Sequence, residues 1–183
     1  MEKLRMLLGN ALAGFLDLCM GAALAAVTLS AFGTHPALWH LAIGSVLGVL
    51  PDFDIIPAVL LGREAAGNHR ATLLHRPLFV IPAAALAAYL IGGQAWGLAA
   101  FACVTWHFLH DTPPLSLGGI AWLWPLDNRY WSPWGPAEPH AGGMSHHAWL
   151  EKYWLAPSPL LLMEMGAGLT ALALALLIAL RAA

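Results

Sequence analysis

Charge is what the sequence has least of. Asp, Glu, Lys and Arg make up 10% of its 183 residues, whereas they make up about 25% of an average soluble domain. The formal net charge of −2 also gives no basic excess of the kind that binds nucleic acid. Because 60% of the residues are hydrophobic and the mean hydropathy is +0.69, the composition excludes an ordinary soluble domain and predicts a membrane protein.

Cysteine is scarce as well. Cys19 and Cys103 lie far apart in apolar stretches, so they form neither a disulfide framework nor a paired metal-binding motif. We expect both to be small buried hydrophobic residues. The apolar run from Met6 to Phe32 is longer than the roughly 7–15 apolar residues of a secretory signal. It therefore predicts an uncleaved transmembrane helix.

Long apolar runs are abundant. A helix needs roughly 20 apolar residues to cross the hydrocarbon core, and we expect an all-α, polytopic helical bundle that forms one integral-membrane domain over residues 1–183. A proline inside a helical run disrupts it, so we expect the second run to be broken at Pro51, either as a span or as a re-entrant element. The five expected spans are about 6–32, 37–61, 73–93, 94–111 and 158–181.

Residues 112–157 form a more polar segment in which six of the nine tryptophans are concentrated. Tryptophan is enriched at membrane–water boundaries because its ring is apolar while its N–H needs a hydrogen-bond acceptor. We therefore expect this segment to lie on the membrane surface. Its tryptophans are Trp122, Trp124, Trp131, Trp134, Trp149 and Trp154.

The basic residues predict the orientation of the chain. With five spans, all but one fall on the same side as the N-terminus, and that side is cytoplasmic by the positive-inside rule. The exception is Arg181. We thus expect a protein of the inner (plasma) membrane with a cytoplasmic N-terminus. The residues on the cytoplasmic side are Lys3, Arg5, Arg63, Arg70, Arg76, Arg129 and Lys152.

Three clusters of potential metal ligands are expected on that same side. If the chain is extended after Pro51, Asp52 and Asp54 point the same way. His107 and Asp111 are four apart and share a helix face, with His110 on its flank. The clusters are Asp52 and Asp54, then His69 and His75, then His107, His110 and Asp111.

Imidazole and carboxylate together suit zinc, manganese or iron. The three carboxylates and three of the imidazoles, without His110, are six ligands, which are too many for one tetrahedral zinc but suit two ions that share a carboxylate. Each cluster alone has an ordinary interpretation: Asp-x-Asp after proline as a turn or helix cap, and the histidine cluster as a solvated helix face. Ionisable groups inside a membrane cost about 2.5–3.5 kcal/mol each, however, and are functional by default. The coincidence of three clusters therefore predicts a site for one or two divalent ions, with zinc first.

Other ionisable residues give weaker signals. Asp17 and Glu164 lie within predicted spans, where they either bond to each other structurally or support the metal site from outside. The histidines of the polar segment add a ligand or a proton shuttle, or are simply exposed. These are His140, His146 and His147.

Three blocks in this order resemble a known family: "ALWHLAIGSVLGVLPDFD", "HRATLLHRPL" and "HFLHDTPPLSLGGIAWLWP". They look like those of the YdjM-type membrane-bound metal-dependent hydrolases, which are also described as LexA-binding and inner-membrane-associated, and they cover about residues 37–126. The chain departs from the family pattern at Ile55, where a histidine is usual, and at Leu74 and Arg76. The resemblance implies an anion-binding role for Arg70 and metal-site roles for Asp52, Asp54, His69, His75, His107 and Asp111.

The leading functional hypothesis is a hydrolase that acts on a lipid-like phosphoester or ester through a metal-activated water at the cytoplasmic face. In this hypothesis Asp54, Asp111 or His110 takes the proton, and Arg70 holds an anionic group. One alternative is a divalent metal transporter or sensor that uses the same ligands. Another is a non-catalytic scaffold that binds a cytosolic protein partner.

Overall fold

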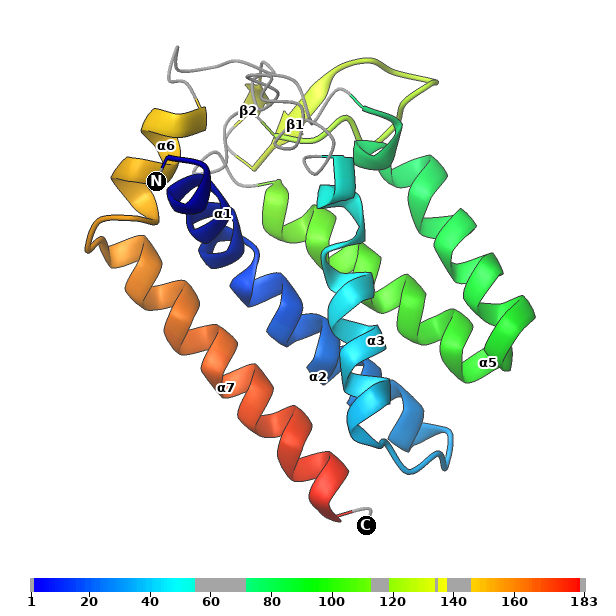
Figure 1. Ribbon diagram of the computed structural model, residues 1–183. Coiled ribbons are helices and arrows are strands. Elements are labelled where there is room, and N and C mark those ends of the chain that lie inside the picture. Colours follow the sequence, from blue (N-terminus) through cyan, green and yellow to red (C-terminus); the bar gives the residue numbers. More distant parts are fainter. Residues whose placement is uncertain (1, 55–71, 113–118, 134, 138–145, 182–183) are drawn as a thin grey trace.

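The computed structural model describes residues 2–54, 72–112, 119–133, 135–137 and 146–181 (Figure 1). It is a helical bundle with one small hairpin, which confirms the predicted helical class. The helices are α1 (Glu2–Ala13), α2 (Phe15–Ala31), α3 (Leu38–Gly48), α5 (Pro77–Asp111), α6 (His146–Tyr153) and α7 (Pro159–Arg181). Two 3-10 helices, η1 (Leu50–Asp54) and η4 (Leu73–His75), and two strands, β1 (Tyr130–Ser132) and β2 (Gly135–Ala137), complete the described elements.

Helix α2 is the centre of the bundle and contacts α3, α5 and α7. Small side chains make these contacts: Ala22 and Ala26 pack with Ala175 of α7, and Ala25 packs with Cys103 of α5. Small residues let helix backbones approach closely. In a membrane the hydrophobic effect does not drive helices together, so helices associate through this close packing. The core is therefore a small-residue core, and both cysteines are buried in it as predicted.

The closest approach is between α2 and α3. A side chain at Gly48 would meet the backbone oxygen of Asp17, and one at Gly44 would meet the backbone of Gly21. Glycine is required at these positions because the neighbouring atoms are backbone and cannot rotate away. This contact fixes the end of α3, and with it η1, relative to α2.

Helix α5 is two arms rather than one rod. Gly93 has φ 78 and ψ −169, a conformation that side-chain-bearing residues rarely adopt, and there the chain reverses direction (Figure 1). Gly97 of the second arm lies against Tyr89 and Ala85 of the first, so the arms run side by side. The predicted boundary between spans 73–93 and 94–111 coincides with this reversal.

The prediction of five spans is wrong for the residues that the structure describes. By length and composition, two helices suffice to cross a membrane, Pro77–Asp111 and Pro159–Arg181, and the pair Leu4–Ala13 and Phe15–Ala31, bent by 42°, is a third if it forms one span. Two physical reasons account for the difference. Helix α3 has only 11 residues and ends at Gly48, and Pro77–Asp111 counts as one helix although it consists of the two arms that meet at Gly93.

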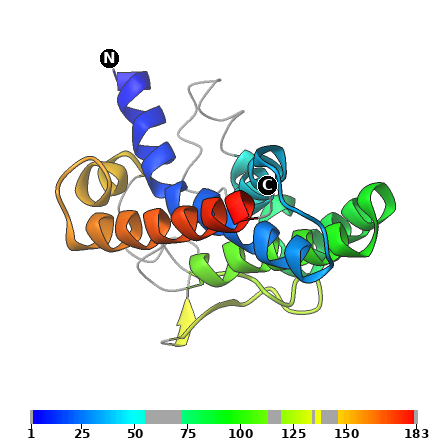
Figure 2. The same cartoon turned by 90° about the horizontal axis from the view of Figure 1, so that it is seen from below.

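One end of the bundle carries the hairpin, α6, η1 and both ends of α5 (Figure 1). Trp131 of β1 pairs with Ile120 through an isolated bridge, and the α6 residue Leu150 packs on Gly9 of α1. An ion pair of 3.0 Å between Arg5 and Glu151 also joins α1 to α6. In the view from below, α1 leans away from the rest of the bundle (Figure 2). The described parts of the tryptophan-rich segment therefore gather at a single end of the molecule.

Candidate metal centre

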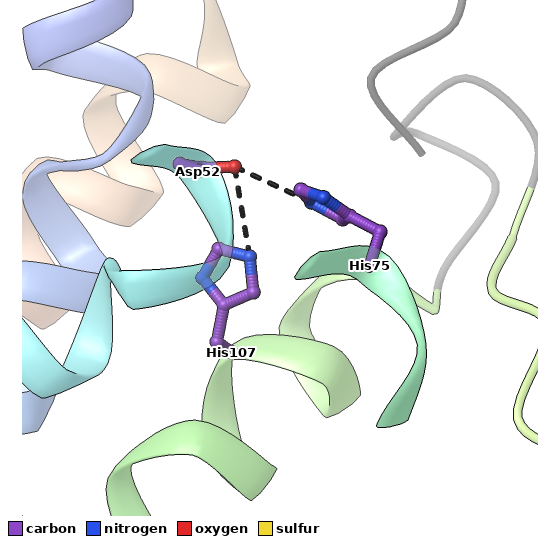
Figure 3. Close-up of side chains that lie close together, drawn as sticks. All are labelled: Asp52, His75 and His107. Carbon is purple, nitrogen blue, oxygen red and sulfur yellow. Dashed lines mark ion pairs between the residues drawn. The ribbon is translucent and has the colours of Figure 1, made fainter. Parts of the chain in front are cut away.

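Three separate elements bring Asp52, His75 and His107 together (Figure 3). Asp52 lies on η1, His75 ends η4, and His107 lies in the last turns of α5. One ligand atom from each of the three lies within 4.8 Å of the other two. Oδ1 of Asp52 is 3.5 Å from Nε2 of His75 and 3.6 Å from Nε2 of His107. The reversal at Gly93 makes this possible, because it returns the end of α5 to its beginning.

Asp111 adds a second carboxylate beside the two imidazoles. Its Oδ2 lies 3.7 Å from Nε2 of His75 and 3.8 Å from Nε2 of His107. The predicted shared face of His107 and Asp111 is thus present. The imidazoles are buried, with exposed fractions of 0% and 1%, whereas the side chains of Asp52 and Asp111 are 29% and 15% exposed. Solvent therefore reaches the group from the side of the acids.

Asp54 lies on the other edge of the His75 ring. Its Oδ2 is 2.9 Å from Nδ1 of His75 and also accepts a hydrogen bond from the Thr72 hydroxyl. The expectation of an extended chain after Pro51 is wrong, because residues 50–54 form a 3-10 helix, in which residues two apart do not share a face. Asp52 and Asp54 consequently hold opposite edges of one imidazole.

His107 is held in the same manner. Its Nδ1 donates to the backbone oxygen of Gly48 at 3.0 Å and lies 3.4 Å from Oδ2 of Asp17. Nε2 of His107 is buried and has no hydrogen-bond partner among the described residues. In metal sites, a histidine that binds the ion through one nitrogen usually donates the other N–H to a carboxylate or a carbonyl. Both histidines have this arrangement.

His110 points away from this group. Its Nδ1 lies 3.0 and 3.1 Å from the two carboxylate oxygens of Asp17, and its Nε2 lies 3.4 Å from Oε1 of Glu164. Trp106 donates from Nε1 to Asp17 at 2.9 Å. Asp17 and Glu164 were expected either to bond to each other or to support the metal site. The imidazole of His110 stands between them instead, and Asp17 reaches the site through His107.

The acids also raise the proton affinity of His75. Burial of the ring lowers its pKa, but hydrogen bonds to Asp52 and Asp54 and the charges of Asp52 and Asp111 outweigh burial, and the pKa is raised from its usual value. Carboxylates that stabilise a positive imidazolium stabilise any cation in the same place. The electrostatic character of the group therefore favours a cation.

The donor set fits a divalent ion. Zinc binds imidazole nitrogen and carboxylate oxygen at about 2.0–2.2 Å in a tetrahedron, which separates neighbouring ligand atoms by about 3.4 Å. The separations of 3.5 and 3.6 Å between Asp52 and the imidazoles are close to that value. Two imidazoles and a carboxylate also suit manganese or iron. The buried Asp–His–His group could thus bind a metal ion.

Several predicted residues fall outside this comparison. His69, Arg70 and His140 lie outside the described residues, as do the side chains of His146 and His147. Three partners of the site were not expected from the sequence: the backbone oxygen of Gly48, the Thr72 hydroxyl and the indole N–H of Trp106. A hydroxyl or a glycine gives no signal in one sequence, whereas the place of Trp106, one residue before a predicted ligand, is a weak signal for a contact near the site.

An apolar helical bundle with helices long enough to cross a membrane, and with a buried cluster of acids and histidines at one end, defines a membrane protein with a candidate metal centre. The chain belongs to the YdjM inner membrane protein family, whose family model matches residues 14–182. This match confirms the resemblance carried by the three sequence blocks and extends it to α2 and α7. No curated protein and no solved structure matches the chain.

Proposed function

We propose that this member of the YdjM family is a membrane-embedded, metal-dependent hydrolase. One observation carries the proposal: Asp52, His75 and His107 come from three separate elements, and their ligand atoms lie within 4.8 Å of one another. Ionisable side chains are expensive in an apolar bundle, so such a group is retained where it has a function. Carboxylates and a carbonyl on the Nδ1 side of both imidazoles further support a metal-binding role.

In this proposal Asp52, His75 and His107 hold one divalent ion, with zinc as the first choice and manganese or iron as the others. Catalytic zinc sites have three protein ligands and leave a position for water, whereas structural sites use four. When bound, the ion supplies Lewis acidity, which activates water near neutral pH and polarises a phosphoryl or acyl oxygen. The described residues contain one compact donor group, which favours one ion over two.

Asp111 is the residue that we propose takes the proton from the water. Its Oδ2 lies 3.7 and 3.8 Å from the two Nε2 atoms, next to the proposed ion position, and a general base has to lie close to the water that it deprotonates. Asp54 is already engaged by His75 and Thr72, and His110 is held between Asp17 and Glu164. Neither is as well placed as Asp111, although the sequence favoured both for catalysis.

The proposed location of the site is the cytoplasmic face. Basic residues of α1 and α6, including Arg5 and Lys152, lie at the same end of the bundle as η1, whereas Arg181 ends α7 at the other (Figure 1). Cytoplasmic segments carry the excess of Lys and Arg. At this end Arg76 is buried and its guanidinium lies 5.3 Å from the Trp124 ring centroid. An arginine next to a ligand suits an anionic group, so a lipid-like phosphoester is the proposed substrate class and an ester is the second.

Metal analysis of the detergent-solubilised protein tests the proposal. The wild type should retain about one equivalent of a divalent metal, and the double variant Asp52→Ala/His107→Ala should retain less than about a tenth of that. Asp127→Ala is the matched control, because Asp127 pairs with the exposed Arg129 and is not one of the grouped donors. The metal-loaded wild type should then hydrolyse members of a panel of lipid phosphates and esters. Equal metal content in wild type and double variant would contradict the proposal.

A further inference from the structure

Asp17 is an acid that the proposed reaction does not use. It lies in α2, its exposed fraction is 3%, and the residues around it in α2 are mostly Ala and Leu. A carboxylate in such a place costs free energy unless other groups compensate it, and intramembrane acids are usually retained for a function.

The contacts of Asp17 reach across to the second arm of α5. Trp106 donates from Nε1 to Oδ1 at 2.9 Å, and His110 donates from Nδ1 at 3.0 Å. Oδ2 lies 3.4 Å from Nδ1 of His107. Three side chains from one stretch of α5 are therefore gathered around a single carboxylate, and one of them is a proposed metal ligand.

We propose that Asp17 is a positioning residue for the metal centre, and this inference rests on the proposed metal site. It acts through His107: its negative charge and the Gly48 carbonyl keep the Nδ1 proton in place, so that the lone pair of Nε2 is directed at the Asp52 side. Trp106 and His110 in turn fix the carboxylate of Asp17. Carboxylates in this position orient a ligating histidine and increase its basicity.

The arrangement at His75 supports the assignment independently. There Asp54 lies on Nδ1 at 2.9 Å while Nε2 faces Asp52. Each of the two histidines thus has one carboxylate behind its ring and shares Asp52 in front. The two rear carboxylates come from different elements, α2 and η1, so the pairing does not arise from a local sequence repeat.

The first test is Asp17→Asn, which keeps the shape of the side chain and removes its charge. Zinc affinity is measured on the purified protein by competition with a chelator, and cobalt(II) is used as a spectroscopic probe. Removal of such a carboxylate typically weakens metal binding about 10–100-fold, and the visible cobalt band should shift because His107 changes its donor strength. Glu151→Gln is the control, because this acid lies on α6 and pairs with Arg5 of α1.

A second variant decides the question if Asp17→Asn does not fold. Trp106→Phe keeps an aromatic ring and removes the N–H that holds Asp17, and it should weaken zinc binding by a smaller factor with a shift of the same cobalt band. Its control is Trp96→Phe on the same arm of α5, where Trp96 stacks on Trp39 with ring centroids 6.2 Å apart. If Trp106 has only a structural role, Trp106→Phe should lower the thermal stability and leave the cobalt spectrum unchanged.

Each result has a defined meaning. Weaker zinc binding and a shifted cobalt band in Asp17→Asn or Trp106→Phe, with both controls unchanged, support the inference. Wild-type affinity and spectrum in these variants overturn it and leave the proposed metal site intact. If the wild-type protein itself binds neither zinc nor cobalt, the proposed function and the positioning role of Asp17 both fail.

Discussion

Nδ1 of His75 lies 2.9 Å from Oδ2 of Asp54, on the edge of the ring that faces away from Asp52. The Pro-Asp-Phe-Asp stretch therefore supplies two acids with different tasks. Asp52 faces the space between the two imidazoles, and Asp54 holds one imidazole from behind together with the Thr72 hydroxyl. The 3-10 geometry of η1 is the reason, since it turns residues two apart to different sides.

This division of tasks predicts unequal effects for two similar substitutions. Asp52→Asn removes a proposed ligand and should abolish stoichiometric zinc retention. Asp54→Asn removes only the group that orients His75 and should weaken zinc binding about 10–100-fold without abolishing it. Chelator competition on both purified variants measures the difference. The interpretation of Asp54 is wrong if its loss costs as much affinity as the loss of Asp52.

The contact between α2 and α3 predicts that Gly48→Ala damages the site from a distance. An added methyl group would press on the backbone oxygen of Asp17, and the resulting shift would displace the Gly48 carbonyl that accepts from His107. Overpacking of this kind typically costs about 1–3 kcal/mol. The temperature of thermal unfolding in detergent and the zinc affinity should therefore both fall.

Gly166→Ala in α7 is the matched control for that substitution. Outside its own helix backbone, no atom lies within 4 Å of the position that its new methyl group would take. Stability should therefore not fall, since alanine favours a helix over glycine, and zinc affinity should stay at the wild-type level. Loss of affinity in Gly166→Ala to the same extent as in Gly48→Ala would show that glycine content, and not the α2–α3 contact, is responsible.

The reversal at Gly93 predicts the topology. Reporters fused after Gly93 and after Asp127 should lie on opposite sides of the membrane. The arms of α5 meet at Gly93, at the end of the bundle away from the hairpin (Figure 1), whereas Asp127 comes shortly before strand β1 of the hairpin. The Asp127 fusion should report the cytoplasm, in keeping with the nearby Arg129 and Lys152. Two reporters on the same side would rule out a transmembrane orientation for the arms of α5.

Hydrolysis and transport predict different behaviour in proteoliposomes. Transporters bind ions near the bilayer midplane between repeated halves, whereas the Asp52, His75 and His107 group lies at one end of the bundle (Figure 1). Labelled zinc or manganese should therefore not accumulate inside vesicles that contain the wild-type protein. Uptake that is lost in Asp52→Ala would turn the assignment from hydrolase to transporter.

The sequence predicted those features that depend on residue type and spacing. The break at Pro51, the chain reversal between 73–93 and 94–111, and the shared face of His107 and Asp111 follow from proline, glycine and helical periodicity. The convergence of Asp52 with His75 and His107 was inferred from their common side of the membrane. The break, the reversal and the shared helix face are specified by local physics, so one sequence is enough to predict them.

The remaining features depend on packing between distant segments. The number of spans was overestimated because hydropathy does not reveal that α3 stops at Gly48, where its backbone meets α2. The place of Asp17 behind His107 depends on which faces of α2 and α5 meet, and small residues such as Ala25 and Cys103 decide that contact. The 3-10 form of η1 likewise depends on its surroundings, and so the separate tasks of Asp52 and Asp54 were not predicted.

The backbone conformation of Gly93 influences metal ligands that lie far from it. His75 lies just before the first arm of α5, and His107 lies near the end of the second. The angle between the two arms therefore influences the distance between the two imidazoles. Gly93 lies at one end of the bundle, and the two imidazoles lie at the other. A residue with a side chain at position 93 would disfavour the φ of 78°. A small change in the angle between the arms would then displace the metal ligands by a larger distance, because the ligands lie far from Gly93.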